Sequence, residues 1–279
     1  MIYSIKKLPF RQLTDFCILL FPLCLCGGSI PPKTVSLVPS VTEIVYALGG
    51  ENALVGVVDP EGYPEDIDKP IVGRFSSPNF ERIYALSPDI VFVESGEQER
   101  FQKPLESLGI EVIIITPKSI DEIFGAIIEV GNIIGKEDEA LTLVDSLKNE
   151  LEKIRKLANV RKEKRTVFFE LSENPLITIG KRSFINELID EAGGINITSD
   201  IDSPYPVISQ ELVVNSNPDV IIIAHDNGTD PKTRIGWKEI EAVKNGRIIE
   251  DVDLNLLLRP GPRVIEGIKT MTYAIYGEL

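Results

Sequence analysis

The side chains that usually carry metal or covalent chemistry are scarce in this chain. His225 is the single histidine, and the three cysteines, Cys17, Cys24 and Cys26, all lie near the amino terminus. Because a zinc site needs three or four nitrogen or sulfur ligands, we expect no dedicated transition-metal site. His225 directly follows a predicted buried strand, so it is a candidate either for the wall of a binding cleft or for a hydrogen-bonded position in a loop.

Motifs of the common enzyme classes are incomplete or missing. The sequence contains no Gly-x-Ser-x-Gly elbow for a nucleophilic serine. Gly131 and Gly135-Lys136 suggest a phosphate loop, but the spacing is one residue short and Glu137 stands where Ser or Thr would hold magnesium. The stretch 251–255 begins like a calcium loop and lacks its glycine and closing glutamate. We therefore expect no catalytic residues, and an exported enzyme or a free transition-metal binder is the disfavoured alternative.

Residues that could bind a ligand without catalysing a reaction are more frequent. In open α/β sheets ligands bind beyond the carboxyl ends of the strands, so the candidates are polar and aromatic side chains in the loops that follow predicted strands. Aromatic rings suit a large flat ligand, and arginines suit carboxylates or phosphates. The candidate ligand-binding residues are Pro39, Ser40, Tyr63, Arg74, Phe75, Lys181, Arg182, Tyr205, His225 and Arg259.

The elements that would position these residues come from an internal repeat. Residues 79–93 and 209–223 align without a gap, and Glu81 and Glu211 each precede a Pro-Asp pair by seven residues. Both stretches predict a short helix, a proline-marked turn and a buried strand, with Asn79 and Ser209 as the amino-terminal caps. One such match would be weak evidence for two related halves.

A second repeated pair supports the first. Residues 43–50 and 187–194 both read as an amphipathic helix that begins with a glutamate, Glu43 or Glu187, and ends at two glycines. Ser40 and Glu43 have the spacing of a capping box. Because the two matched pairs occur in the same order, the sequence predicts two similar α/β lobes.

The predicted strands alternate with helices, which favours parallel sheets covered on both faces. Between the lobes, Ser119 and Glu122 form another capping box, and apolar residues recur at helical spacing up to about Leu157. We therefore expect two α/β lobes joined by a stiff helical connection, with the N-terminal lobe at 29–118, the interlobe helix at 119–160 and the C-terminal lobe at 161–279. The predicted strands are 34–38, 54–58, 90–93 and 112–115 in the first lobe, and 166–170, 220–224 and 247–249 in the second.

The first 28 residues read as a secretory signal peptide. Lys6, Lys7 and Arg11 precede an apolar run from Phe16 to Leu25, which is too short to span a bilayer. The residues around Cys24 and Cys26 weakly match a lipoprotein cleavage box, in which Cys26 would carry a lipid anchor. The net charge of −14 argues against nucleic acid, whose affinity comes from Lys and Arg contacts to phosphates. The same charge suits a basic partner or simply keeps the protein soluble.

At family level the sequence resembles the class III periplasmic solute-binding proteins of ABC importers. The resemblance rests on the opening 35–43, on 79–83 with Ser87-Pro88-Asp89, on 208–211 with Asn217-Pro218-Asp219, and on 180–194 and 237–247. It covers nearly the whole chain from Val35 onward. The family implies two Rossmann-like lobes joined by a long rigid α-helix. It also implies capture of cobalamin, a ferric siderophore or haem in the cleft between the lobes, and delivery to a permease dimer with its ATPase subunits.

The resemblance also suggests roles for individual residues. Phe75 and Tyr205 match positions where the cobalamin-binding branch places tryptophans, and Glu81 and Glu211 match glutamates that dock onto the permease. The Pro204-Tyr205-Pro206 segment favours a cobalamin-type corrinoid, with ferric siderophore or haem as the alternatives. We expect an exported periplasmic or cell-surface monomer, lipid-anchored if Cys26 is acylated, with no cofactor of its own.

Overall fold

The computed structural model describes residues 31–279 except 60, 61, 227 and 279. The predicted signal peptide, with Cys24 and Cys26, lies outside the described residues. Residues 31–279 form one compact unit. No described helix is both long enough and apolar enough to cross a membrane.

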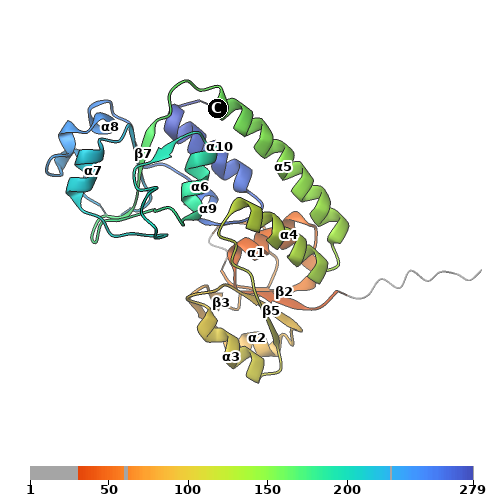
Figure 1. Ribbon diagram of the computed structural model, residues 1–279. Helices are drawn as coiled ribbons and strands as arrows, with labels where there is room; N and C mark the ends of the chain where they lie inside the picture. Colours follow the sequence, from red (N-terminus) through yellow and green to blue (C-terminus); the bar gives the residue numbers. More distant parts are fainter. Residues whose placement is uncertain (1–30, 60–61, 227, 279) are drawn as a thin grey trace, which may run out of the picture. The chain divides into compact units, whose positions relative to one another are not determined.

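Four short parallel strands make up the sheet of the first lobe, in the order β2-β1-β5-β6. Val35, Val57 and all of β5 are buried because helices cover the sheet (Figure 1). The elements of this lobe are β1 Thr34–Ser36, α1 Pro39–Ala47, β2 Leu54–Val57, the small hairpin β3 Gly73–Arg74 and β4 Ser77–Pro78, α2 Phe80–Ala85, β5 Ile90–Val93, α3 Glu99–Ser107 and β6 Glu111–Ile114. A 3-10 turn at Glu51–Ala53 leads into β2.

The second lobe repeats this arrangement. Its elements are β7 Thr166–Ser172, β8 Ile177–Thr178, α6 Phe184–Glu191, β9 Ile195–Asn196, α7 Gln210–Ser216, β10 Val220–Ile223, α8 Glu241–Lys244, β11 Ile248–Ile249, α9 Leu254–Leu258 and α10 Val264–Tyr276, with 3-10 turns at Pro231–Thr233 and Trp237–Glu239. β7 pairs in parallel with β9 and β10, and β10 with β11. The order β9-β7-β10-β11 therefore matches β2-β1-β5-β6.

β8 is the exception to the parallel sheets that the sequence predicts. It pairs antiparallel with β7, because only four residues separate the two strands and a connection that short cannot return the chain in the parallel sense. β3 and β4 are likewise antiparallel, and β9 had no counterpart among the predicted strands. All seven predicted strands are present, with ends that differ by up to two residues.

The repeat extends to individual hydrogen bonds. Asn79 and Ser209 cap α2 and α7 as predicted, their side chains accepting from the backbone N–H of Arg82 and Leu212. At the strand that opens each half, Asp89 Oδ2 accepts from Lys33 N and Asp219 Oδ2 accepts from Thr166 N, both at 2.8 Å. The two halves are therefore built on one backbone plan.

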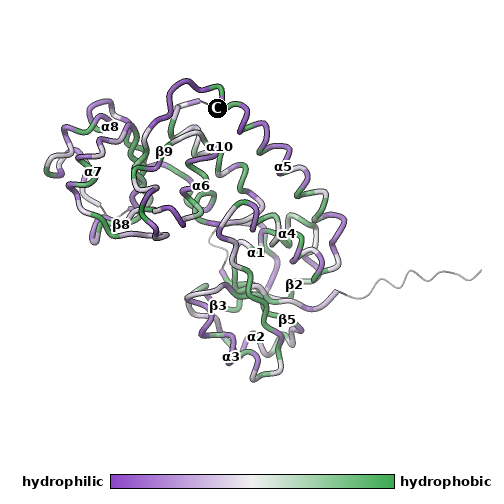
Figure 2. Tube along the Cα trace, viewed as in Figure 1, coloured by the Kyte–Doolittle hydropathy of each residue, from purple (hydrophilic) through white to green (hydrophobic). Residues whose placement is uncertain are grey.

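The connection between the lobes consists of two helices, α4 Ile120–Ile133 and α5 Glu137–Asn159. Gly135 separates them with a φ of 73°. α5 packs on α4 at one end and on α6 and α10 of the second lobe at the other, as Figure 1 shows. In Figure 2 its colour alternates along the helix, which reflects one apolar face and one charged face.

One apolar core runs through both lobes. A single cluster of buried side chains extends from Val41 and Ile44 on α1, through Ile127 on α4 and Val144 on α5, to Leu188 on α6 and Met271 on α10. Two smaller clusters lie under the outer faces of the two sheets, one around Val91 and one around Phe168 and Trp237. The lobes are therefore joined by packed helices.

One predicted cap is wrong. Ser40 and Glu43 do not form a capping box, because α1 begins at Pro39 and Val38 is its amino-terminal cap residue. The Glu43 carboxylate contacts arginines of the second lobe instead. At α4 the Ser119 side chain does accept from Glu122 N, but the Glu122 carboxylate accepts from Lys118 N, one residue before the position that a capping box requires.

Candidate ligand-binding cleft

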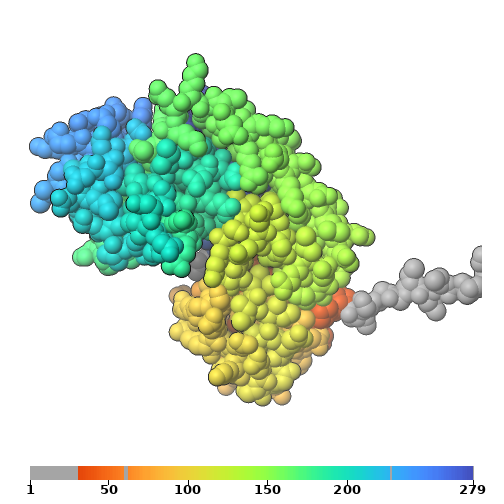
Figure 3. Space-filling model, viewed as in Figure 1, coloured from red at the N-terminus to blue at the C-terminus, as the bar shows by residue number. Residues whose placement is uncertain are grey.

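A recess of about 440 Å³ has one wall from each lobe. Figure 3 shows the surface hollowed where the cyan segment of the second lobe meets the yellow segment of the first. The recess is lined by Glu94, Ser95, Thr116, Pro117, Lys118, Arg182, Phe184, Ile185, Pro204, Tyr205, Leu258 and Pro260. The first-lobe residues directly follow β5 and β6, so this cleft lies at the carboxyl ends of strands, where α/β proteins bind ligands.

The first-lobe wall is held together by short polar contacts. Ser95 N donates to Thr116 Oγ1 at 2.6 Å, which ties the loop after β5 to the loop after β6. Glu94 is half-buried, and its pKa is raised, first by burial and then by repulsion from Glu97. The cleft therefore offers an acid that is more easily protonated than usual.

Gln98 fixes three loops behind this wall. Its side chain is fully buried, and Nε2 donates to Leu37 O at 2.8 Å and to Phe75 O at 2.9 Å. Its Oε1 accepts from Glu94 N at 3.0 Å. One amide thus satisfies backbone groups at the end of β1, in the β3–β4 hairpin and at the end of β5.

The second-lobe wall presents an aromatic ring on a fixed segment. Tyr205 is 55 % exposed and stands between Pro204 and Pro206. The carbonyls of both prolines accept backbone hydrogen bonds, from Gly180 N at 3.0 Å and from Thr178 N at 3.1 Å. A Cβ on Gly180 would lie 2.3 Å from Ser203 O, so only glycine allows this close approach. The backbone that carries the ring is therefore fixed before any ligand arrives.

Of the predicted ligand residues, the structure brings only Arg182 and Tyr205 to this cleft. Arg182 is also paired, because its Nε lies 3.1 Å from Asp202 Oδ1 and its Nη2 donates to Asp202 O at 2.9 Å. A ligand anion would compete with Asp202 for this guanidinium.

Three predicted ligand residues make contacts within the protein. Arg259 donates to Glu43 Oε1 and to Tyr63 O, both at 3.2 Å, and the Tyr63 ring lies against Arg263. His225 Nε2 lies 2.8 Å from Glu170 Oε1.

The contact of His225 belongs to a buried network. Arg234 makes a bidentate pair with Glu170, at 2.6 and 2.9 Å, and both side chains are almost fully buried. Because a buried carboxylate needs a matched partner, the arginine and the histidine together fix the loop that follows β10. Sequence reasoning placed His225 correctly at a strand end and could not foresee its buried partner.

The remaining predicted residues are spread around the first-lobe loops and the start of α6. Pro39 and Ser40 form the first turn of α1, with Ser40 buried. Arg74 is exposed on β3, and Phe75 is half-buried beside it in the β3–β4 hairpin. Lys181 is exposed beside Arg182. None of these five is among the described residues that line the recess.

Sequence reasoning missed the polar residues of the first-lobe wall, namely Glu94, Ser95, Thr116 and Lys118. The signal was present, because the strands before them were predicted at 90–93 and 112–115.

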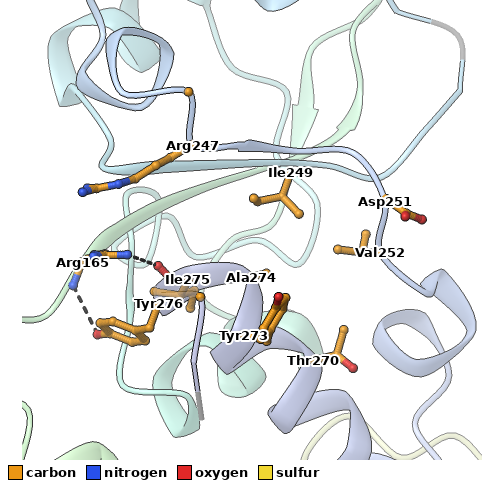
Figure 4. A pocket seen from close by; sticks show the side chains of 12 residues that line it. Arg165, Arg247, Ile249, Asp251, Val252, Thr270, Tyr273, Ala274, Ile275 and Tyr276 are labelled. Carbon is orange, nitrogen blue, oxygen red and sulfur yellow. Dashed lines mark hydrogen bonds between the residues drawn. The ribbon is translucent and has the colours of Figure 1, made fainter.

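Another pocket, of about 390 Å³, belongs to the second lobe alone (Figure 4). It lies between edge strand β11 and α10, with Arg165, Arg247, Tyr273 and Tyr276 around it. Arg165 is occupied there, because Nη1 donates to Ile275 O at 2.6 Å and its guanidinium lies beside the Tyr276 ring. Since no first-lobe residue lines this pocket, the interlobe recess is the better candidate for ligand capture.

Glu81 and Glu211 occupy equivalent exposed positions. Each lies in the first turn of its short helix, two residues after the capping side chain. Neither makes an ion pair with another described residue. Within the described part of the chain, no three His, Cys, Asp or Glu side chains are grouped to hold a metal ion.

Two similar α/β lobes, bridging helices and a cleft between strand ends define a periplasmic-type substrate-binding protein. The family model described as "Periplasmic binding protein" matches residues 35–253, and the chain belongs to this family. It is thus an extracytoplasmic substrate-binding protein of an ABC transporter, which partners with a permease and an ATPase and takes a small-molecule ligand. It is a binding protein and not an enzyme, as the sequence predicted.

Individual proteins show the same similarity. The chain is 35 % identical to the uncharacterized ABC transporter substrate-binding lipoprotein YvrC of Bacillus subtilis, over 88 % of this chain and 80 % of that protein. It is 30 % identical to the vitamin B12-binding protein of Salmonella paratyphi A, over 88 % and 90 %. The solved periplasmic heme-binding protein RhuT of Roseiflexus sp. RS-1 superimposes with a TM-score of 0.77 at 26 % identity, covering 88 % and 98 %.

Proposed function

We propose that the interlobe cleft binds a cobalamin-type corrinoid and that the protein delivers it to an ABC permease. The observation that carries this proposal is the Tyr205 ring, exposed on the cleft wall and held between two prolines. A flat macrocycle can stack on such a ring with little loss of side-chain entropy. The similarity to a vitamin B12-binding protein over 88 % of this chain supports the same ligand class.

The polar residues of the cleft suit the edge of such a ligand. Ser95, Thr116 and Lys118 on one wall and Arg182 on the other can donate hydrogen bonds to amide carbonyls or to a phosphate. Glu94 can accept from amide N–H groups. The recess holds only part of a ligand of this size, so the remainder would stay exposed between the lobes.

The alternative is a ferric siderophore, or haem with the Tyr205 hydroxyl as an iron ligand. The likeness to a heme-binding protein favours haem within this alternative. Ultraviolet–visible titration of the purified protein with cyanocobalamin, haemin and a ferric siderophore distinguishes the three. We expect saturable binding of cyanocobalamin. A new charge-transfer band with haemin, lost in Tyr205→Phe, together with no cyanocobalamin binding, would establish the alternative.

We also propose that Glu81 and Glu211 dock the protein onto the permease. A first-turn carboxylate is favoured by the helix dipole, which explains one such glutamate. It does not explain a pair of exposed carboxylates at equivalent points of two lobes. Two matched negative charges suit a permease built from two similar subunits with basic pockets, where rim ion pairs orient and speed docking.

The protein is proposed to act as a monomer, tethered by lipid on Cys26. The description of the Bacillus subtilis relative as a lipoprotein supports the tether. Mass spectrometry of protein from its native envelope tests it: we expect a diacylated amino-terminal cysteine, absent after Cys26→Ser. An unmodified Met1 would contradict export.

A further inference from the structure

Glu43 and Glu187 are equivalent residues of the two halves. Their helices, α1 and α6, end with the same backbone hydrogen bonds: Gly49 N to Tyr46 O and Gly50 N to Val45 O in one, Gly193 N to Asp190 O and Gly194 N to Ile189 O in the other. Gly49 and Gly193 both have positive φ, 61° and 81°. Counted back from these glycines, the two glutamates occupy the same place.

Glu43 reaches from the first lobe to the second. Its side chain is 1 % exposed, and Oε2 accepts from Arg263 Nε at 2.9 Å while Oε1 accepts from Arg263 Nη2 at 2.8 Å. Oε1 also accepts from Arg259 at 3.2 Å. The Arg263 guanidinium lies 3.6 Å from the centre of the Tyr63 ring, so a first-lobe ring covers the second-lobe cation.

Glu187 reaches in the opposite direction. From α6 of the second lobe, its Oε2 accepts from Ile120 N, at the start of α4, at 2.8 Å. This N–H belongs to the first turn of a helix, where a carboxylate is stabilised. α4 packs against α1 of the first lobe.

Both contacts adjoin the walls of the recess. Arg259 lies between Leu258 and Pro260, which line it, and Ile120 lies two residues after Lys118, which also lines it. Glu187 shares α6 with the wall residues Phe184 and Ile185. Each glutamate therefore holds a wall segment of the other lobe.

We propose that Glu43 and Glu187 are positioning residues that set the separation of the cleft walls, one from each lobe. The inference rests on the recess being the ligand site proposed above. It reassigns Arg259 and Tyr63, which were predicted to bind ligand, to the contact that fixes the cleft. The ion pair of Glu43 and the backbone hydrogen bond of Glu187 run in opposite directions between the lobes, so together they should resist both opening and twisting of one lobe against the other.

Each test variant is compared with a control variant. The control loses the same kind of bond, but at a site that does not join the two lobes. Glu187→Ala removes the carboxylate at Ile120 N, whereas Glu122→Ala removes the one at Lys118 N, at the same helix start but from within α4 itself. Glu43→Gln weakens a bidentate arginine pair between the lobes. Its control, Glu191→Gln, weakens the bidentate pair with Arg155, which joins α5 to α6. Glu187→Gln keeps an acceptor and should restore parental behaviour.

The lobe separation is read without ligand. Spin labels at Lys103→Cys on α3 and Asn215→Cys on α7, both exposed, are introduced in the full chain with Cys17, Cys24 and Cys26 changed to serine. Pulsed electron paramagnetic resonance should show a broadened or shifted distance distribution for Glu43→Gln and Glu187→Ala. The two controls and Glu187→Gln should match the parent.

Ligand kinetics provide the second measurement. With cyanocobalamin as the probe, we expect dissociation to be about tenfold faster in both test variants and within about twofold of the parent in Glu191→Gln. Glu122→Ala is a control for the label distances alone, because Glu122 bonds the backbone of the wall residue Lys118. If Glu43→Gln does not fold, Glu43→Asp replaces it, because it keeps the charge and shortens the reach. Parental distance distributions in folded Glu43 and Glu187 variants would overturn the proposal. If the parent does not bind cyanocobalamin, the corrinoid function fails and the label distances still decide the positioning role.

Discussion

Ser87 and Asn217 adopt the same left-handed backbone conformation, with φ of 47° and 45°, at equivalent points of the two lobes. Each precedes the Pro-Asp pair that leads into a buried strand. They are the only non-glycine residues with positive φ in the part of the chain that the structure describes. The repeat therefore keeps the same strained turn in both halves, although the residue at that position is serine in one half and asparagine in the other.

Ser87→Gly should raise the free energy of unfolding by about 0.5 kcal/mol, because glycine adopts positive φ without the steric cost that serine has. Asn217→Gly should instead lower it by about 1 kcal/mol, because Asn217 Oδ1 accepts from Glu241 N at 2.8 Å. Urea unfolding of both variants measures the difference. Equal effects of the two changes would show that the side-chain bond of Asn217 is without consequence.

Gln98→Leu should destabilise the protein by about 2–4 kcal/mol, because it leaves backbone groups of three loops without their buried partner. Gln102→Leu is the control, since its amide donates to Glu106 on the same helix, and it should change stability by about 0.5 kcal/mol or less. Because Phe75 and Glu94 both lose their anchor, ligand affinity should fall as well. A Gln98→Leu protein of parental stability would mean that water replaces the amide.

The pKa of Glu187 predicts a pH dependence of stability. It is raised, first by burial and then by repulsion from Glu191 and Asp121, against the opposing hydrogen bond from Ile120 N and the charge of Arg155. A raised pKa in the folded state means that the stability contributed is present below the unfolded pKa of about 4.3 and is lost as pH rises through the folded value.

Glu187→Gln removes that titration and keeps an acceptor for Ile120 N. Its free energy of unfolding should therefore gain on the parent as pH rises above about 4.3, up to the folded pKa, and then run parallel to it. Urea unfolding from pH 4 to pH 7 measures this. A difference that stays constant with pH would show that Glu187 titrates alike in both states.

Tyr205→Ala should weaken binding of cyanocobalamin by about 2–4 kcal/mol, because a ring on the cleft wall loses its stacking contact. Tyr273 is the matched control. It is 65 % exposed and lines the pocket of Figure 4, so Tyr273→Ala should leave the affinity unchanged. Calorimetry on the two variants decides between the pockets, and the reverse result would move the ligand to the second lobe.

Replacing Glu81 and Glu211 together by alanine should abolish or strongly reduce uptake and importer-stimulated ATP hydrolysis. Ligand affinity should stay within about twofold, and the loss of stability should be near 0.3–1 kcal/mol for each first-turn charge. Glu99→Ala with Glu266→Ala is the control, because these are also exposed first-turn glutamates. Normal transport by the Glu81 and Glu211 double variant would exclude the docking role.

The fold was largely predictable because its signals are local. Buried β-branched runs, capping side chains at Asn79 and Ser209, and the glycines after α1 and α6 can each be recognised within a few residues. The repeat added long-range information, since it implied two lobes of one plan. β8 and β9 were not among the predicted strands, although β11, which is equally short, was.

The candidate site was less predictable because it depends on partners distant in sequence. Arg259 and Glu43 are separated by 216 residues, and no local sequence pattern around either residue predicts their ion pair. Glu43 instead had the spacing of a local cap to Ser40. A carboxylate three residues after a serine can bond either to the start of its own helix or to a side chain distant in sequence. Only the three-dimensional fold shows which of the two forms.

The apolar core that runs from α1 through α4 and α5 to α10 bears on how this protein is made. Because the helices at the junction bury their faces against the opposite half, neither half produced alone could hide its apolar surface from water. During synthesis, the first half would expose this apolar surface to water until the second half is complete. We therefore expect the two halves to fold and unfold together, in one cooperative transition.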